Sequence, residues 1–330
     1  MKQYLTPRWL TLFTAIFLLL LWFIAFLWSF EPDTFDPRQV SYQQAQQGNE
    51  QVVAGYTLTT SLIQVSETLL NKSGGYLSND VLPPSLFMDN MPSWEFGALE
   101  MARDLALAMR KDLSRSQSQS AENSFLTDAQ PKFNIDHRSW LLPSAESQYQ
   151  GAIDKLYEYR SSLSNSGQGS AQFYARADNL RDWLKQVEKR LGSLSQKLSA
   201  SVGQDRLDTS LAGDASATQS TPSASFLQDK TSWWKLDDNF YEARGASWAL
   251  LHFLKAVEVD FGEVLEKKNA LVSVQQIIRE LESTQEAVWS LMILNGSGFG
   301  MLANHSLVMA NYISRANAAL IELSELLNQG

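Results

Sequence analysis

The chain has 330 residues, 44% of them hydrophobic and 19% charged, with no cysteine and a formal net charge of −9. This length allows one or two domains with a real core. The lack of cysteine excludes a disulfide scaffold, a cysteine-ligated metal centre and a thiol enzyme. Only Lys2 and Arg8 are charged within residues 1–30, which leaves 25 basic and 36 acidic side chains in the rest. This acidic balance indicates that nucleic acid is not a partner.

Residues 9–30 contain no charged side chain. As a helix this stretch is about 33 Å long, which matches the hydrocarbon core of a bilayer. Trp9 and Trp28 lie near its ends, where indole rings favour the membrane interface. The alternative is a cleaved signal peptide, whose apolar region is usually shorter and ends in a small-x-small site. We therefore predict a transmembrane anchor that contacts the lipid bilayer.

The charges that flank the anchor predict its orientation. Lys2 and Arg8 precede it, whereas three carboxylates follow it closely. The positive-inside rule then places residues 1–8 in the cytoplasm as a short tail and everything after residue 30 outside. For a bacterium, this means the inner membrane and a periplasmic domain. The chain has no second apolar run of 18 residues, so we predict a single pass.

Residues 31–50 are polar and contain proline, and we interpret them as a stalk. After the stalk, apolar residues recur every three or four positions, as in helices with one buried face. The predicted helices cover residues 51–71, 93–113, 144–163, 170–201, 237–267, 270–293 and 300–328.

The fold class predicted from this spacing is all-α. The apolar repeat averages seven residues per two turns, which favours coiled-coil-like heptad packing in a multi-helix antiparallel bundle. No segment alternates with the period of a strand. Residues 203–229 are rich in Ser, Ala, Thr, Gly and Asp, and we predict a disordered linker there. It divides the bundle into a first half, 51–202, and a second half, 230–330.

Two features of the sequence suggest chemistry but favour a structural role. The segment NGSGFG at 295–300 could be a phosphate loop, but it lacks a preceding strand and a basic residue, so we interpret it as a turn between helices. His137, His252 and His305 are far apart and form no ligand pair. We predict no catalytic residue, no metal site and no cofactor.

The densest combination of aromatic and charged residues lies between positions 233 and 244. This possible ligand patch consists of Trp233, Trp234, Asp237, Asp238, Glu242 and Arg244. Aromatic rings stack on sugars and carboxylates bind their hydroxyl groups, so the patch could bind a glycan. In the structural interpretation, which we favour, an aspartate caps a helix and the tryptophans pack under the edge of the bundle.

Several long strings carry a resemblance to a known family. They are NMPSWEFGALEMARDLA, SRSQSQS, FYARADNLRDWL, RLGSLSQKLSASVG, FYEARGASWALLHFLKAVEVDF and ILNGSGFGMLANHSLVMANYISRANAAL. The chain resembles domain-of-unknown-function family 2333, single-pass inner-membrane proteins of bacteria, along nearly its whole length. The resemblance implies an envelope protein and no particular activity.

The main functional hypothesis is therefore a non-enzymatic interaction or scaffold protein of the cell envelope, with an envelope protein as partner. The alternative is a protein or enzyme that acts on peptidoglycan or another glycan through residues 233–244. A ligand-sensing domain ranks below both, because a tail of eight residues leaves no room for an output module. A homo-oligomer stays open, since an uncovered apolar stripe would suit a dimer.

Overall fold

The computed structural model describes residues 7–116, 121–165, 167, 171–207, 226–290, 292–297 and 300–329. Within these residues the chain forms eleven α-helices and one pair of short strands. The α-helices are α1 (Pro7–Trp28), α2 (Pro37–Gly48), α3 (Tyr56–Asn71), α4 (Asn90–Ala108), α5 (Ser124–Phe133), α6 (Ala145–Ser164), α7 (Ala177–Ser199), α8 (Leu236–Asp260), α9 (Gly262–Lys267), α10 (Leu271–Ser283) and α11 (His305–Asn328). The all-α prediction is confirmed.

Shorter elements join the helices. They are the 3₁₀-helices η1 (Ser85–Phe87), η3 (Ala200–Val202) and η4 (Trp233–Lys235), the π-helical turn η2 (Met109–Leu113), and the strands β1 (Gln204–Leu207) and β2 (Phe226–Asp229). The two strands pair antiparallel, with Gln204 opposite Asp229.

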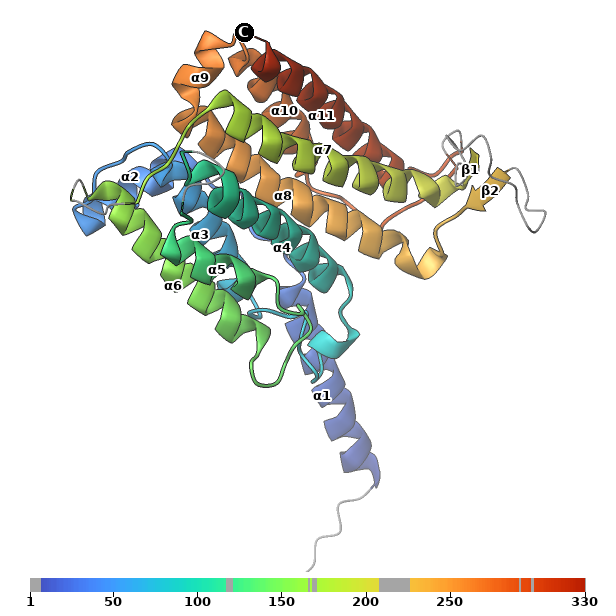
Figure 1. Cartoon of the computed structure of the whole chain (residues 1–330). Coiled ribbons are helices and arrows are strands. Elements are labelled where there is room, and N and C mark those ends of the chain that lie inside the picture. The colour runs from blue at the N-terminus through green and yellow to red at the C-terminus, as the bar shows by residue number, and fades with distance from the viewer. Residues whose placement is uncertain are drawn as a thin grey trace, which may run out of the picture.

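The helices after α1 form one body around α8, which packs against α3, α4 and α10 (Figure 1). On one side α7 lies along α11, and on the other α5 and α6 pair with each other and α6 packs on α3. The buried apolar residues form one cluster that includes side chains of both predicted halves, such as Trp94 and Leu184 from the first and Trp248 and Leu320 from the second. Helix α1 projects from this body (Figure 1).

The contact between α4 and α8 depends on two glycines. A Cβ on Gly97 would lie 1.9 Å from the carbonyl oxygen of Glu242, and one on Gly245 would lie 1.9 Å from that of Trp94. Real atoms cannot approach so closely, so the two backbones touch only because neither position carries a side chain. This contact brings α8 into the centre of the body.

The structure differs from the predicted stalk at residues 31–50. Helix α2 forms there, begins at Pro37 with Asp36 as its N-cap, and packs on α3 and α8. Its buried residues are Pro37, Ser41 and Ala45, spaced by one helical turn. These side chains are small, so the segment lacks the large apolar stripe on which the helix predictions depended.

Other boundaries also differ. Helix α5 lies in a stretch for which no helix was predicted, and the predicted helix at 270–293 ends at Ser283. The predicted helix at 237–267 is divided into α8 and α9 at Phe261. Strands β1 and β2 form at the two ends of the predicted linker 203–229, although the sequence shows no strand pattern there. The middle of that linker, residues 208–225, lies outside the described residues.

Candidate functional site

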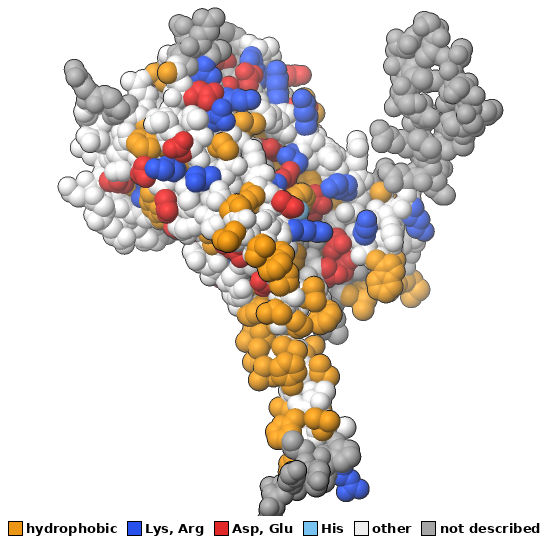
Figure 2. Space-filling model, turned by 60° about the horizontal axis from the view of Figure 1, so that its bottom comes forward, with side chains coloured by type: hydrophobic (Ala, Val, Ile, Leu, Met, Phe, Trp, Pro, Cys, Tyr) orange, Lys and Arg blue, Asp and Glu red, His pale blue; other side chains and the backbone are white. Residues whose placement is uncertain are grey.

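Helix α1 is long and apolar enough to cross a membrane, a property that it shares with a signal sequence. None of its apolar span is buried in the body. Figure 2 shows hydrophobic side chains along the projecting helix and gathered where it leaves the body. The junction between α1 and the body is therefore the candidate functional site.

The segment after α1, residues 29–35, lies against α8. The guanidinium Nε of Arg244 donates to Glu31 Oε2 at 2.6 Å. Two residues further on, the indole Nε1 of Trp248 donates to the carbonyl oxygen of Asp33 at 3.3 Å. Phe35 then stacks on the ring of His252, with centroids 3.8 Å apart and planes 10° apart. Three side chains from successive turns of α8 hold this segment, and we call them the α8 clamp.

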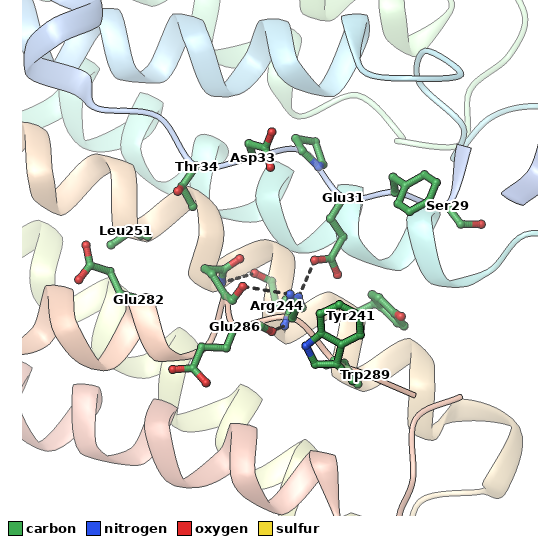
Figure 3. Close-up of a pocket in the computed structure, with 15 residues that line it drawn as sticks. Ser29, Glu31, Asp33, Thr34, Tyr241, Arg244, Leu251, Glu282, Glu286 and Trp289 are labelled. Atoms are coloured by element: carbon green, nitrogen blue, oxygen red, sulfur yellow. Dashed lines mark hydrogen bonds and ion pairs between the residues drawn. The ribbon is translucent and has the colours of Figure 1, made fainter. Parts of the chain in front are cut away.

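Arg244 also fixes the end of α10. Its two terminal nitrogens donate to the carbonyl oxygens of Thr284, Glu286 and Gln285, at 3.0, 2.8 and 3.2 Å. Figure 3 shows this side chain between Glu31 and the backbone that leads to Glu286. These carbonyl groups belong to the three residues that follow α10, and a cation is favourable at this end of a helix. Arg244 thus joins α8, the end of α10 and the segment after α1.

His252 is fully buried and bonded through both ring nitrogens. Its Nδ1 lies 2.7 Å from the carbonyl oxygen of Trp248, and its Nε2 lies 3.0 Å from the backbone nitrogen of Phe35. A backbone N–H only donates, so Nε2 accepts and the proton is on Nδ1. Burial lowers the pKa of His252 to about 3, with the nearby Lys255 acting in the same direction. The ring is therefore neutral at physiological pH.

A second contact holds the end of α1 itself. Trp28 lies over Gly74, where a Cβ would come within 2.7 Å of the indole ring and where φ is +87°. The loop of Gly74 is fixed by a buried ion pair between Lys72 and Glu95. Glu95 also accepts hydrogen bonds from the backbone nitrogens of Leu77 and Ser78, at 2.9 and 2.8 Å. We call this arrangement the Gly74 seat.

A pocket of about 680 Å³ opens beside the α8 clamp, lined by Glu31, Asp33, Arg244, Glu282, Glu286, Trp289 and neighbouring residues (Figure 3). Apart from Arg244, its charged lining residues are acidic, and one of them, Glu282, pairs with Lys255 at 2.7 Å. Within the part of the chain that the structure describes, no group of three His, Asp or Glu side chains is arranged to hold a metal ion.

The structure does not bring the six residues of the predicted patch into one site. Trp233 and Trp234 are 69% and 77% exposed, so the prediction that they pack under the bundle edge is wrong. Asp238 accepts from the Ser93 hydroxyl at 3.2 Å, and Glu242 pairs with Lys197 at 2.7 Å. Arg244 is buried in the α8 clamp.

The expected aspartate cap is also absent, because Lys235 occupies the N-cap position of α8. Asp237 and Asp238 lie in the first turn. There the negative charges of both carboxylates are favourable, because they lie at the positive end of the helix dipole.

The remaining predicted features have local partners. His137 packs on Phe96, and His305 accepts from the backbone nitrogen of Leu294 at 3.0 Å. In the segment 295–300, residues 298 and 299 lie outside the described residues. The rest belongs to a long loop between α10 and α11 that is closed by pairing of Asn295 with Asn304.

Sequence reasoning missed the α8 clamp and the Gly74 seat. Glu31 and Arg244 are 213 positions apart, and Trp28 and Gly74 are 46 apart. No local spacing connects such pairs. The sequence offered one signal, the polar and aromatic residues of α8. Of the three clamp residues, the predicted patch included only Arg244.

The fold and the junction define an all-α protein with one exposed apolar helix fixed to a helical body. The chain belongs to the family described as "Uncharacterized protein conserved in bacteria (DUF2333)", whose profile matches residues 2–330. No curated protein and no solved structure matches it.

Proposed function

We propose that the protein is a single-pass inner-membrane protein of bacteria that holds its helical body in the periplasm and acts there as a scaffold for another envelope protein. The observation that carries this proposal is the junction of α1 with the body. None of the apolar window of the 21-residue helix Arg8–Trp28 is buried in the body, yet its last residue packs against the body.

The junction favours a retained anchor over a cleaved signal peptide. Trp28 belongs to the side chains packed against the core, and residues 31–35 are bound by the α8 clamp. Cleavage near residue 30 would remove Trp28 from its place on Gly74 and leave a new terminus inside these contacts. A signal peptide has no need to pack against the mature protein.

The charges on either side of α1 support a periplasmic body. Lys2 and Arg8 precede the helix, and Glu31, Asp33 and Asp36 follow it. The positive-inside rule favours the N-terminus in the cytoplasm.

Membrane association and orientation are tested together. Full-length protein with a C-terminal tag is expected to stay in the membrane after a carbonate wash and to keep residues 1–30 by intact mass. Protease added to spheroplasts is expected to digest the tag, whereas inverted vesicles protect it. A soluble, shortened product would overturn the anchor, and digestion only in inverted vesicles would overturn the orientation.

The scaffold role is tested by crosslinking in living cells followed by mass spectrometry. Photo-crosslinkers placed at exposed positions of the body are expected to give one recurrent envelope protein. Turnover of an envelope substrate by the purified protein, lost on a point substitution, would contradict a non-enzymatic role.

The alternative of glycan binding keeps one supporting observation. Trp233 and Trp234 are both exposed, with ring centroids 5.2 Å apart. Against it, Arg244 is buried and all its nitrogens already have partners. If the glycan function is correct, cell-wall sacculi retain the purified protein and Trp234→Ala weakens that retention.

A further inference from the structure

Exposed apolar side chains gather on three segments that lie on the side of the body from which α1 projects. They are η1, the loop between α5 and α6, and η4 (Figure 1). Six of their side chains are 57–95% exposed: Leu86, Phe87, Trp140, Leu142, Trp233 and Trp234. We call these six residues the apolar rim. Single exposed apolar residues are common, but a group of this size on one side marks an interaction surface.

The three segments form one surface. A pocket of about 630 Å³ is lined by residues of all of them, including Leu86, Arg138 and Lys235. The loop that leads to η1 is also bonded to the loop before α6. Asn79 donates to the carbonyl oxygen of Ser139 at 2.9 Å and to Glu146 at 2.7 Å.

This surface lies at the level of the last turns of α1. Leu21, Ile24, Ala25 and Trp28 are partly covered, whereas the residues between them are exposed. Their spacing is that of one helical face, so one side of the last two turns faces the body. The covering elements include the Gly74 seat, which continues into the segment of Leu77 that borders the same pocket. Figure 2 shows this region as a gathering of hydrophobic side chains around the base of α1.

We propose that the apolar rim inserts into the outer leaflet of the membrane that α1 crosses, so that the body binds lipid directly. This inference depends on the proposed anchor. The α8 clamp and the Gly74 seat fix the body beside α1, and the rim then meets the boundary between headgroups and acyl chains. Trp and Leu suit this boundary. The pocket between the segments carries Arg138 and Lys235 together with four carboxylates, so the apolar side chains of the rim, not its net charge, favour the bilayer. A partner protein would have to occupy space that lipid already fills.

The lack of cysteine makes a direct test available, because any introduced cysteine is labelled uniquely. Three variants place a spin label on the rim: Phe87→Cys, Leu142→Cys and Trp234→Cys. Leu19→Cys reports on α1. Val272→Cys is the matched control, because Val272 is an exposed apolar residue in the first turn of α10. This turn follows α9, which lies at the end of the body away from α1 (Figure 1). Full-length proteins are reconstituted in vesicles of phosphatidylethanolamine and phosphatidylglycerol.

We expect the three rim labels to collide readily with oxygen dissolved in lipid. Their accessibility to an aqueous nickel complex should be at least threefold lower than that of the label at 272. If the rim labels are as accessible to nickel as residue 272 while the label at 19 reads lipid, the inference is wrong and the anchor stands. Glycan or protein would then be the occupant of the rim. If the label at 19 is also aqueous, the proposed anchor itself has failed.

Discussion

At residue scale, Arg244 is the residue on which the junction depends most. Its side chain is 8% exposed and binds one carboxylate and three backbone carbonyl groups. A charge buried this far is tolerated only when its donors have partners. Because those partners belong to two separate segments, one after α1 and one after α10, loss of the guanidinium detaches both from α8 together.

Arg244→Ala should lower the free energy of unfolding by about 3–5 kcal/mol, because Glu31 and three carbonyl groups lose their partner. Chemical denaturation in detergent, followed by tryptophan fluorescence, measures the change. The control is Arg176→Ala, whose ion pair with Asp178 is about half exposed, and whose loss should cost less than about 0.5 kcal/mol. Equal effects of the two substitutions would contradict the clamp.

His252 makes the junction sensitive to acid. Its pKa is about 3 in the folded protein against an ordinary value of 6.5. The unfolded chain therefore binds the proton first as the pH falls. The stabilisation from neutral His252 is complete above pH 6.5 and is lost between pH 6.5 and 3, by at most about 1.4 kcal/mol per pH unit.

The wild type should consequently lose its stability advantage over His252→Gln as the pH falls from 7 to 4. Thermal unfolding of both proteins across this range measures the difference. Asp260, whose pKa burial raises to about 7, acts in the opposite direction. It is present in both proteins and cancels in the comparison. Parallel stability curves would show that His252 does not titrate on unfolding.

At the scale of elements, the backbones of α4 and α8 cross so closely that two glycines have no room for a side chain. Gly97 and Gly245 each face a carbonyl oxygen of the opposite helix. Glycine inside a helix costs about 1 kcal/mol relative to alanine. Here the cost is offset, because the larger residue would push apart the two helices that centre the core.

Gly97→Ala and Gly245→Ala should each lower the free energy of unfolding by about 3 kcal/mol, since the backbone must move to admit a Cβ. Gly262→Ala is the matched control: nothing lies within 4 Å of its added Cβ, and its effect should stay within about 0.5 kcal/mol. The same denaturation measurement applies. A neutral result at both Gly97 and Gly245 would contradict the close crossing.

The elements were predicted well where a large apolar residue recurs with each turn. Helix α7 lies within the predicted helix 170–201 and buries six large apolar residues spaced three or four positions apart: Leu180, Leu184, Val187, Leu191, Leu194 and Leu198. Helix α2 was missed because its buried face consists of Pro37, Ser41 and Ala45. Periodicity carries on past the end of α10 in the sequence. The chain leaves the helix there, and Arg244, from another helix, binds the carbonyl groups of 284–286.

The candidate site was less predictable than the fold for the same reason. The sequence grouped Arg244 with its neighbours Trp233 and Asp238 in one patch. In the structure its partners are Glu31 and the backbone that follows α10. Which of its nitrogens bind which oxygens follows from the packing of α8, and that packing depends on contacts between distant residues. Composition and periodicity describe single elements, whereas the junction consists of contacts between them.

For the molecule as a whole, the junction determines how the body is oriented. A polar stalk would let the body turn freely about α1. The structure instead connects α1 through residues bound by Arg244, Trp248 and His252 and through Trp28 on Gly74. Few rotatable bonds remain free between α1 and the body, so their relative position should be fixed. If α1 is the proposed anchor, a fixed position presents the same face of the body to the bilayer in every molecule.

Spin labels at Leu19→Cys and Val272→Cys should therefore give a narrow distance distribution in vesicles, measured by double electron–electron resonance. Adding Arg244→Ala should broaden that distribution, because residues 29–35 lose their strongest contact with α8. Adding Arg176→Ala should leave it narrow, since that exposed ion pair is remote from the junction. A broad distribution already present in the doubly labelled protein would mean that the body moves independently of its helix, and the rim would then meet the membrane only intermittently.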